Sequence, residues 1–356
     1  MIMTKEVQSI NNTITKNSVA KDRRVQINLD QCGAISLKLT ELKLGPFRLP
    51  ASKDLLPFDD DEKDLNYLFL MCTLLFDLKG LGGKVGGEWL HGSEYFFAAM
   101  KQKTRECPDL FDPHTLAETS TSRIGSLLLR IGDNPNDFSK RASERAEILR
   151  DTAQELVLHY EGQVSNLFNN CDGFLIRDDS KGLVQLMQRF KGYADPHFKK
   201  GFVFLKFVTK LGFFEPVDEQ NLYVPIDYHV MRVALRTGVI EIIDGNLKHR
   251  LTNKIPSKAE DDFQIREAAK NALKTIEETS NFDAFDLDDI FWNIGRSHCH
   301  YSHAPMCYTC PGIQCTFESL LNYKCRGECL LRGVCKGSLS EAYRKLQEPS
   351  LNTTYY

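Results

Sequence analysis

The cysteines of this chain gather toward the end of the sequence. Seven of the eleven lie between Cys299 and Cys335, and the first four, Cys299, Cys307, Cys310 and Cys315, form the run C-x7-C-x2-C-x4-C. A tight loop with an internal C-x2-C brings thiolates to one point, as an iron–sulfur cluster or a zinc ion requires. Incidental thiols or disulfides are the alternative. They are disfavoured because no secretory segment opens the sequence, so we expect a reducing, cytoplasmic or otherwise intracellular compartment.

A second set of cysteines follows the first with the spacing C-x3-C-x5-C. It consists of Cys325, Cys329 and Cys335. Together with one nearby histidine, these thiols could complete a zinc site, and the candidates are His298, His300 and His303. They could equally be free thiols or spare ligands of the first site, and the sequence leaves these alternatives open.

Asp227 is the strongest candidate for a catalytic group outside the cysteines. It lies at the start of an expected amphipathic helix, 227–237. Such an aspartate is usually an N-cap that accepts hydrogen bonds from backbone N–H groups. The helix dipole and those donors are expected to hold the carboxylate ionised. Arg232 and Arg236 share one face of this helix, where we expect solvated or salt-bridged side chains rather than phosphate contacts.

The segment 226–233, with the sequence I-D-Y-H-V-M-R-V, resembles the V-D-T-H-V-x-R-V segment of helix-hairpin-helix DNA glycosylases of the endonuclease III kind. In that family the aspartate is the catalytic carboxylate, and a four-cysteine loop that binds a 4Fe–4S cluster follows two helices later. The run 291–299 and the three cysteines after it are similar to that loop. The glycine-rich hairpin of the family, L-P-G-x-G, is not matched upstream, where only Gly201 could serve.

Over about residues 18–296 the chain also resembles the queuosine-salvage N-glycosylases, relatives of the same fold. The matching pieces occur in the same order, at 18–19, 25–27, 66–70, 92–95, 144–151, 199–202, 227–233 and 264–266. The resemblance again implies that Asp227 is the catalytic carboxylate, and it places Lys199 and Asn66 at motif positions. The family's base-stacking run N-F-x-F-W corresponds here to 75–79, with the sequence L-F-D-L-K.

Both resemblances imply cleavage of an N-glycosidic bond through an oxocarbenium-like transition state. Asp227 would stabilise the sugar cation and activate water. Lys199 or Lys200 could form a Schiff base with an opened sugar and add lyase activity, although a solvated helix start is the simpler interpretation. The expected substrate-binding residues are Asn66, Phe76, Tyr228 and His229. His229 is also explained as a packing residue or a support for the carboxylate.

Composition restricts the partners. The net charge of −3 provides no global basic field for a long polyanion. No stretch approaches the roughly 20 apolar residues that cross a bilayer, so we expect no membrane partner. The long ordered resemblance to the queuosine-salvage N-glycosylases, together with this charge, gives the first hypothesis, a glycosidase for a modified purine-like nucleoside, nucleotide or nucleic acid. The alternatives are a base-excision DNA glycosylase with a 4Fe–4S cluster and a non-catalytic nucleic-acid-binding iron–sulfur protein. The released base and the oligomeric state stay open.

Hydrophobic periodicity predicts a mostly α protein that would position these residues. The expected domains are a flexible segment 1–22, a glycosylase-like domain of two helical lobes 23–296, a cysteine-rich cluster loop 297–337 and a tail 338–356. A small N-terminal β addition is expected from strands at 25–29 and 35–39, and the glycines at 80–87 are interpreted as a flexible connection. The expected helices are 65–78, 93–100, 119–131, 143–160, 165–170, 181–190, 198–211, 227–237, 258–278 and 286–296.

Overall fold

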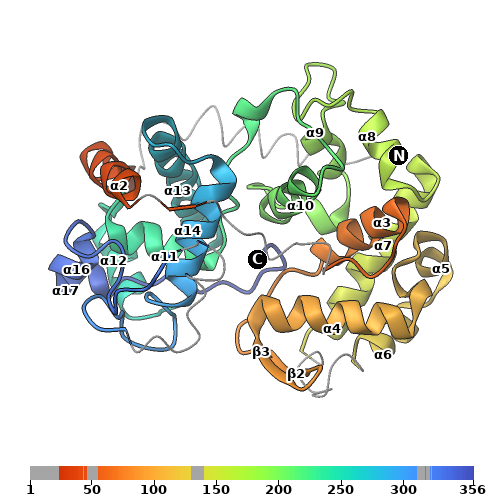
Figure 1. The fold of residues 1–356 in the computed structure, drawn as a ribbon, viewed down its shortest axis with the longest axis horizontal. Helices are drawn as coiled ribbons and strands as arrows, with labels where there is room; N and C mark the ends of the chain where they lie inside the picture. Colours follow the sequence, from red (N-terminus) through yellow and green to blue (C-terminus); the bar gives the residue numbers. More distant parts are fainter. Residues whose placement is uncertain are drawn as a thin grey trace.

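The computed structural model describes residues 24–42, 44–45, 55–129, 140–310, 317, 321 and 323–356. The segment 1–22, expected to be flexible, and Cys315 lie outside these ranges. Helices dominate the described residues, with two short pairs of strands, which confirms the expected mostly α class. Figure 1 shows two helical lobes side by side, with the last residue of the chain between them. Each lobe has its own hydrophobic core.

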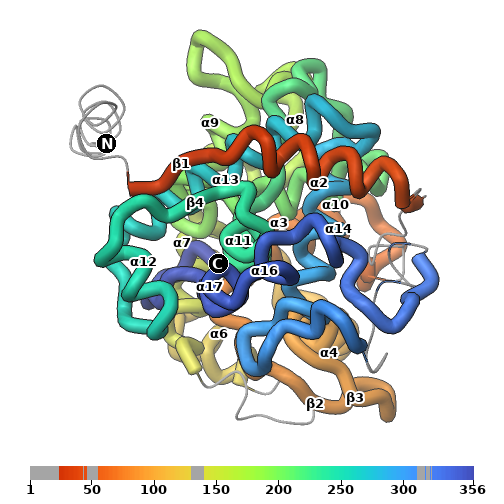
Figure 2. Tube along the Cα trace, turned by 90° about the vertical axis from the view of Figure 1, so that its left-hand side faces the viewer, coloured from red at the N-terminus to blue at the C-terminus, as the bar shows by residue number. Residues whose placement is uncertain are grey.

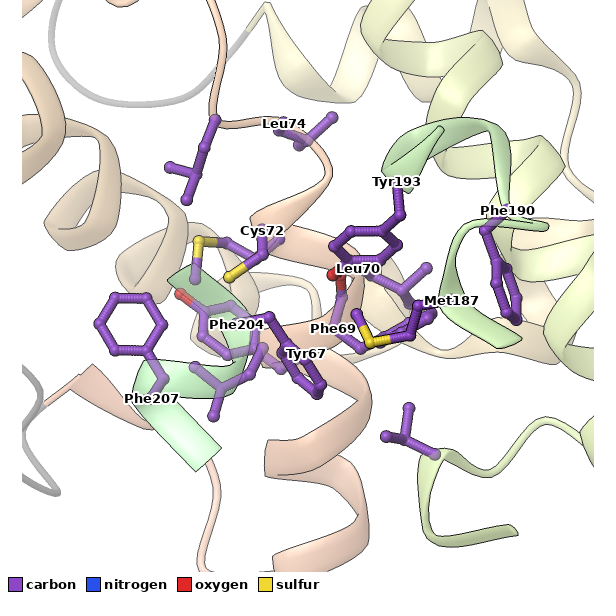
Figure 3. Packing of buried hydrophobic residues seen from close by; sticks show 14 of the residues in the cluster. Tyr67, Phe69, Leu70, Cys72, Leu74, Met187, Phe190, Tyr193, Phe204 and Phe207 are labelled. Carbon is purple, nitrogen blue, oxygen red and sulfur yellow. The ribbon is translucent and has the colours of Figure 1, made fainter. Parts of the chain in front are cut away.

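The first lobe is continuous in sequence and surrounds one central helix. Its elements are α3 (Asp61–Cys72), β2 (Gly82–Val85), β3 (Glu88–His91), α4 (Gly92–Glu106), α5 (Pro113–Glu118), α6 (Thr121–Leu128), α7 (Ala142–Tyr160), α8 (Val164–Asn169), α9 (Leu183–Met187) and α10 (Lys199–Lys210). Every residue of α3 from Asp64 onward is buried, as expected for a helix enclosed on all sides. Figure 3 shows Phe69 and its aromatic neighbours, with the Phe69 ring centroid 5.2 Å from that of Phe190 and 5.3 Å from that of Phe204.

The second lobe combines both ends of the described chain. Its elements are β1 (Val25–Ile27), α2 (Leu29–Glu41), α11 (Tyr228–Thr237), β4 (Ile240–Ile242), α12 (Gly245–Thr252), α13 (Ala259–Thr279), α14 (Ala284–Arg296), α16 (Lys336–Leu339) and α17 (Glu341–Arg344). β1 pairs antiparallel with β4, so that Val25 lies opposite Ile242. Helix α2 lies along α13 (Figure 2). The segment after residue 223 therefore folds together with the N-terminal one.

The second strand expected at 35–39 is wrong, because these residues belong to α2. Asn28 caps this helix by accepting a hydrogen bond from the N–H of Gln31 at 3.0 Å. Ile35 and Leu39, four residues apart, are fully buried on one face, whereas Leu37 is 64% exposed. Apolar residues at 35, 37 and 39 alternate as in a strand, but only Ile35 and Leu39 belong to the buried face of the helix.

The flexible connection expected at 80–87 is also wrong. β2 and β3 form a hairpin in which Gly82 lies opposite His91 and Val85 lies opposite Glu88. The turn between them needs positive φ, and Gly86 and Gly87 adopt φ values of 60° and 87°. The glycines therefore define an ordered turn.

The expected tail 338–356 is an integral part of the fold. Leu346, Glu348 and Tyr356 are all buried. The Tyr356 hydroxyl donates to the Asp262 carboxylate on α13. Because this segment passes between the lobes, it contributes to whatever site lies there (Figure 1). Among the described helices, none combines the length and the apolar character needed to cross a bilayer.

Candidate active site and metal centre

A cavity of about 680 Å³ lies between the lobes. One side is formed by α10 and the segment that follows α3, and the other by α11, α14 and the loop 297–310. Its charged wall includes Lys199, Lys206, Asp227, Asp288 and Asp289, and its aromatic wall includes Phe76, Phe97, Phe207, Tyr228, Trp292 and Tyr301. Sites for small molecules are commonly cavities of about 300–1,000 Å³ with apolar walls and a few polar groups. The volume and lining of this cavity match that description.

Asp227 caps α11, as the sequence indicated, and lines the cavity. Its Oδ1 accepts a hydrogen bond from the N–H of Val230 at 2.9 Å. The carboxyl does not have the lowered pKa that a helix start would give it. Burial raises the pKa of Asp227, and the opposing influences of Lys199 and of the cap hydrogen bonds are smaller. The low polarity of the interlobe site therefore outweighs the helix start.

Lys199 and Lys200 do not form a solvated helix start, because both side chains are buried. Lys199 lines the cavity and donates from Nζ to the carbonyl of Leu75 at 3.2 Å. Burial lowers its pKa, while the carboxylates of Asp227 and Asp288 act in the opposite direction. The lysine thus lies within electrostatic reach of the candidate catalytic carboxylate.

Lys200 has a different position from its neighbour and is not part of the cavity wall. Its Nζ donates to the carbonyl of Thr73 at 2.8 Å and lies 5.2 Å from the centroid of the Phe76 ring. Burial and the charge of Lys199 lower the pKa of Lys200 to about 7. Its contacts attach α10 to the end of α3, so the structure separates the two lysines that the sequence treated as equivalent.

A lysine–carboxylate cluster on the cavity wall was missed by sequence reasoning. Lys206 Nζ lies 2.8 Å from Asp288 Oδ2 and 2.7 Å from Asp289 Oδ1, so it joins α10 of the first lobe to α14 of the second. Burial lowers the pKa of Lys206, but the two carboxylates outweigh it and the net shift is upward. The sequence signal that could have revealed it is a single lysine inside the apolar run 202–208, because a lysine buried in such a run needs a charged partner.

Two further predicted site residues, Tyr228 and His229, lie beside Asp227 on the cavity wall. The Tyr228 ring has Lys79 Nζ 4.4 Å from its centroid, within the range of a cation–π interaction. His229 Nδ1 accepts from Arg232 at 2.9 Å. Burial and the Arg232 charge hold the pKa of His229 well below its ordinary value, so this imidazole is a neutral packing group that supports the start of α11.

Of the two other residues predicted to bind substrate, Phe76 lies on the cavity wall and Asn66 does not. Phe76 lines the cavity, and the guanidinium of Arg145 lies 4.5 Å from its ring centroid. Asn66 does not line the cavity. Its amide donates to the carbonyl of Gly162 at 3.0 Å and accepts from the N–H of Val164 at 3.1 Å, which fixes α3 against the turn before α8. The position predicted for substrate contact is therefore occupied by a structural hydrogen-bond pair.

Arg232 and Arg236 are not solvated, because their side chains are buried in the second lobe. Arg232 forms an ion pair with Glu348 at 2.8 Å, which agrees with the salt-bridged alternative. Both arginines donate to the carbonyl of Cys299, at 2.5 Å and 3.2 Å respectively. They connect the helix that carries Asp227 to the cysteine-rich segment.

Four buried thiols of that segment lie close together, because Cys299, Cys307 and Cys335 all act electrostatically on the Cys329 thiol. Burial raises the pKa of Cys329 well above its ordinary value, and the other three thiols raise it further. Burial and the thiols of Cys299 and Cys307 raise the pKa of Cys335 to about 12. Such a set of thiols could hold a metal centre, because a bound metal takes the thiolate form.

A second group consists of His298, Cys310 and Cys325, whose ligand atoms all lie within 4.8 Å of one another. This grouping differs from both ligand sets expected from the sequence. Cys310 lies close to Cys325, and Cys329 lies close to Cys307, because backbone hydrogen bonds pair the segment 307–310 with the segment 327–329. The N–H of Cys310 donates to the carbonyl of Gly327 at 2.7 Å, and the N–H of Cys329 to that of Cys307 at 3.3 Å.

Comparison with known proteins adds no family assignment. No protein-family model matches the chain, and a search of curated proteins finds no match either. The functional argument therefore rests on the cavity, the cysteine-rich segment and the sequence motifs.

Proposed function

We propose that this protein hydrolyses the N-glycosidic bond of a modified purine-like nucleoside, nucleotide or nucleic acid in the interlobe cavity. The observation that carries the proposal is the position of Asp227, a buried carboxylate at the start of α11 that lines a cavity with an aromatic wall. Its motif resembles the catalytic segment of the helix-hairpin-helix glycosylases. We also propose that the chain as a whole has the fold of these glycosylases.

The chemistry requires few groups. As the bond between the sugar and the base breaks, the bonding electron pair leaves with the base and positive charge develops on the sugar carbon. Asp227 would stabilise that charge and take the proton from the water that attacks the same carbon. Lys199 favours the ionised form of the carboxylate, because its positive charge lowers the pKa of Asp227.

The aromatic wall supports a planar base as the leaving group. Tyr228, Trp292 and Tyr301 line the cavity, and base–aromatic stacking contributes about 1–3 kcal/mol per base in nucleic-acid complexes. Lys79 lies on the same wall with its side chain 37% exposed, and a phosphate would share this lysine with Glu348, whose Oε1 is 2.8 Å from Lys79 Nζ. On this basis we propose a nucleotide as the substrate class.

Contact with duplex DNA has less support. Gly201 was the one residue that could replace the glycine-rich hairpin of the DNA glycosylases. A Cβ at Gly201 would overlap the ring of Phe198, so the glycine accommodates an aromatic ring inside the first lobe. We expect weak binding to plain duplex DNA that decreases steeply with salt.

For the cofactor we propose a 4Fe–4S cluster on Cys299, Cys307, Cys329 and Cys335. Four buried cysteines in one place match the donor set of such clusters. The positive charges of Arg344 and Arg236 favour the thiolate of Cys307, although burial opposes it. When bound, the cluster would add four iron–thiolate bonds between the loop after α14 and the segment before α16.

A base-release assay tests the proposed activity. The purified protein is incubated with a panel of nucleosides, nucleotides and single- and double-stranded nucleic acids that carry modified purines, and the freed base is measured by chromatography with mass detection. We expect release from at least one nucleotide, abolished by Asp227→Asn. Absence of release from every member by a metal-loaded, folded protein would contradict the proposal and favour the non-catalytic alternative.

A further inference from the structure

We propose that His298, Cys310 and Cys325 bind one zinc ion at a site separate from the four-thiol group. Their ligand atoms all lie within 4.8 Å of one another. A zinc ion with bonds of about 2.0–2.3 Å to nitrogen and sulfur fits between donors at this spacing. One imidazole and two thiolates suit zinc rather than magnesium or calcium. The described residues supply three of the ligands that a tetrahedral site takes.

The hydrogen bonds around His298 leave one ring nitrogen available as a ligand. The Ser297 hydroxyl donates to the carbonyl of Asn293 at 2.6 Å, so at 3.1 Å it can only accept from His298 Nδ1. The proton of the neutral ring is therefore on Nδ1, and Nε2 carries a lone pair. A hydrogen bond at the other ring nitrogen is the arrangement that orients metal-ligating histidines.

The environment of His298 Nε2 is the second independent indication. This atom is buried and has no hydrogen-bond partner among the described residues, in a side chain that is 2% exposed. A buried acceptor without a partner costs about 1–3 kcal/mol, and native structures contain few of them. A metal ion between Nε2 and the two thiols removes this cost.

Backbone hydrogen bonds bring the three ligands together. The N–H of Cys310 donates to the carbonyl of Gly327 at 2.7 Å, two residues beyond Cys325. The N–H of Met306 donates to the carbonyl of His298 at 2.8 Å, which closes the loop 298–306. The protein chain itself thus pre-forms the site.

The site adjoins the interlobe cavity. Ser297, Tyr301, Met306 and Cys310 all line that cavity, so a zinc ion would hold both ends of the loop that carries Tyr301. We assign the ion a structural role, which is to keep this loop on the cavity wall. Any consequence for substrate binding rests on the proposed function, whereas the metal site does not.

Metal content decides the proposal. The full chain and its variants are produced with iron and zinc supplied, purified without oxygen, checked by circular dichroism and analysed for both elements. We expect one zinc per wild-type chain. Cys325→Ser and His298→Gln should lose zinc and keep iron, and Cys329→Ser should lose iron and keep zinc. The matched control Cys107→Ser, in the first lobe, should keep both.

Several outcomes would overturn the site: a wild type without zinc, a Cys325→Ser variant with full zinc, or loss of iron rather than zinc in Cys325→Ser. Where a variant fails to fold, cobalt replaces zinc in the chelator-treated wild type and absorption is recorded. A tetrahedral spectrum with charge transfer from two thiolates per cobalt supports the site. A charge-transfer absorption as intense as that of four thiolates per cobalt contradicts the site, and so does the absence of a tetrahedral spectrum. Because no activity is measured, failure here is distinct from failure of the proposed glycosidase.

Discussion

Two lysines of α10 reach the same cavity and pair very differently with the carboxylates of the opposite lobe. Lys206 contacts Asp288 and Asp289 directly, at 2.8 Å and 2.7 Å. Lys199 instead donates to the carbonyl of Leu75 and acts on Asp227 through its charge. Burial raises the pKa of all three carboxyls, but only Asp288 and Asp289 contact a lysine directly, whereas Asp227 forms no ion pair with any described residue.

We interpret the Lys206 cluster as structural and propose that Asp227 is reactive. Asp288 and Asp289 each contact the Lys206 ammonium, and removing the lysine strands their charge in a medium of low polarity. Asp227 lines the same cavity without an ion pair among the described residues, and a perturbed carboxylate in such a position is characteristic of sites where charge develops during a reaction. We therefore propose that Lys206 holds the lobes together and that Asp227 carries the chemistry.

The largest effect is expected for Asp227→Asn. Asparagine caps a helix about as well as aspartate, so the melting temperature should change little. The neutral amide cannot stabilise a sugar cation or accept a proton from water, so base release should fall by about 10²–10⁴. Melting curves and single-turnover rates test both statements. Full activity in this variant would end the catalytic assignment.

For the structural pair, Lys206→Met should reduce the free energy of unfolding by about 3–5 kcal/mol, because two buried carboxylates lose their cation. The deficit should shrink as pH falls, because the stranded carboxylates take up protons on folding. Lys210→Met is the matched control on the same helix. Its closest carboxylate oxygens are 3.7 Å and 4.0 Å away and its side chain is 32% exposed, so about 0–1 kcal/mol is expected. Denaturant titrations at two pH values compare the variants, and equal losses would remove the distinction.

Lys199→Met should change the pH dependence of catalysis. The Lys199 charge lowers the pKa of Asp227, so its removal should raise that pKa and leave less carboxylate ionised at a given pH. The acid limb of the kcat profile should move to higher pH, with the greatest loss of rate at low pH. Lys200→Met, off the cavity wall, is the control and should leave the limb in place. An unchanged profile in Lys199→Met would show that this lysine does not act on the reacting carboxylate.

The smallest effect expected is the stability loss of Asp227→Ala, which removes the cap of α11. The lost hydrogen bond to the N–H of Val230 corresponds to about 1 kcal/mol. Comparing Asp227→Ala with Asp227→Asn by chemical denaturation separates the cap from the chemistry. A cap-only aspartate predicts near-normal turnover in the Asn variant together with this stability loss in the Ala variant.

The sequence by itself determined the local features. The helical class follows from hydrophobic periodicity, and the expected helix 143–160 agrees with α7, Ala142–Tyr160, within one residue. Asp227 was identified as the residue at the start of α11, because capping depends on neighbours along the chain. A metal-binding region was equally predicted from the close spacing of the cysteines between Cys299 and Cys335. All of these depend on residues close together in the chain.

The tertiary structure alone decided the grouping and environment of those residues. Lys199 and Lys200 are adjacent in sequence, yet one lines the cavity and the other contacts Thr73. Spacing paired Cys307 with Cys310, whereas the fold places Cys310 with Cys325 through its hydrogen bond to Gly327. The direction of the Asp227 pKa shift depends on burial between two lobes. The physical reason is common to all three: ligation, pairing and desolvation depend on neighbours in space, and those neighbours come from segments far apart in the chain.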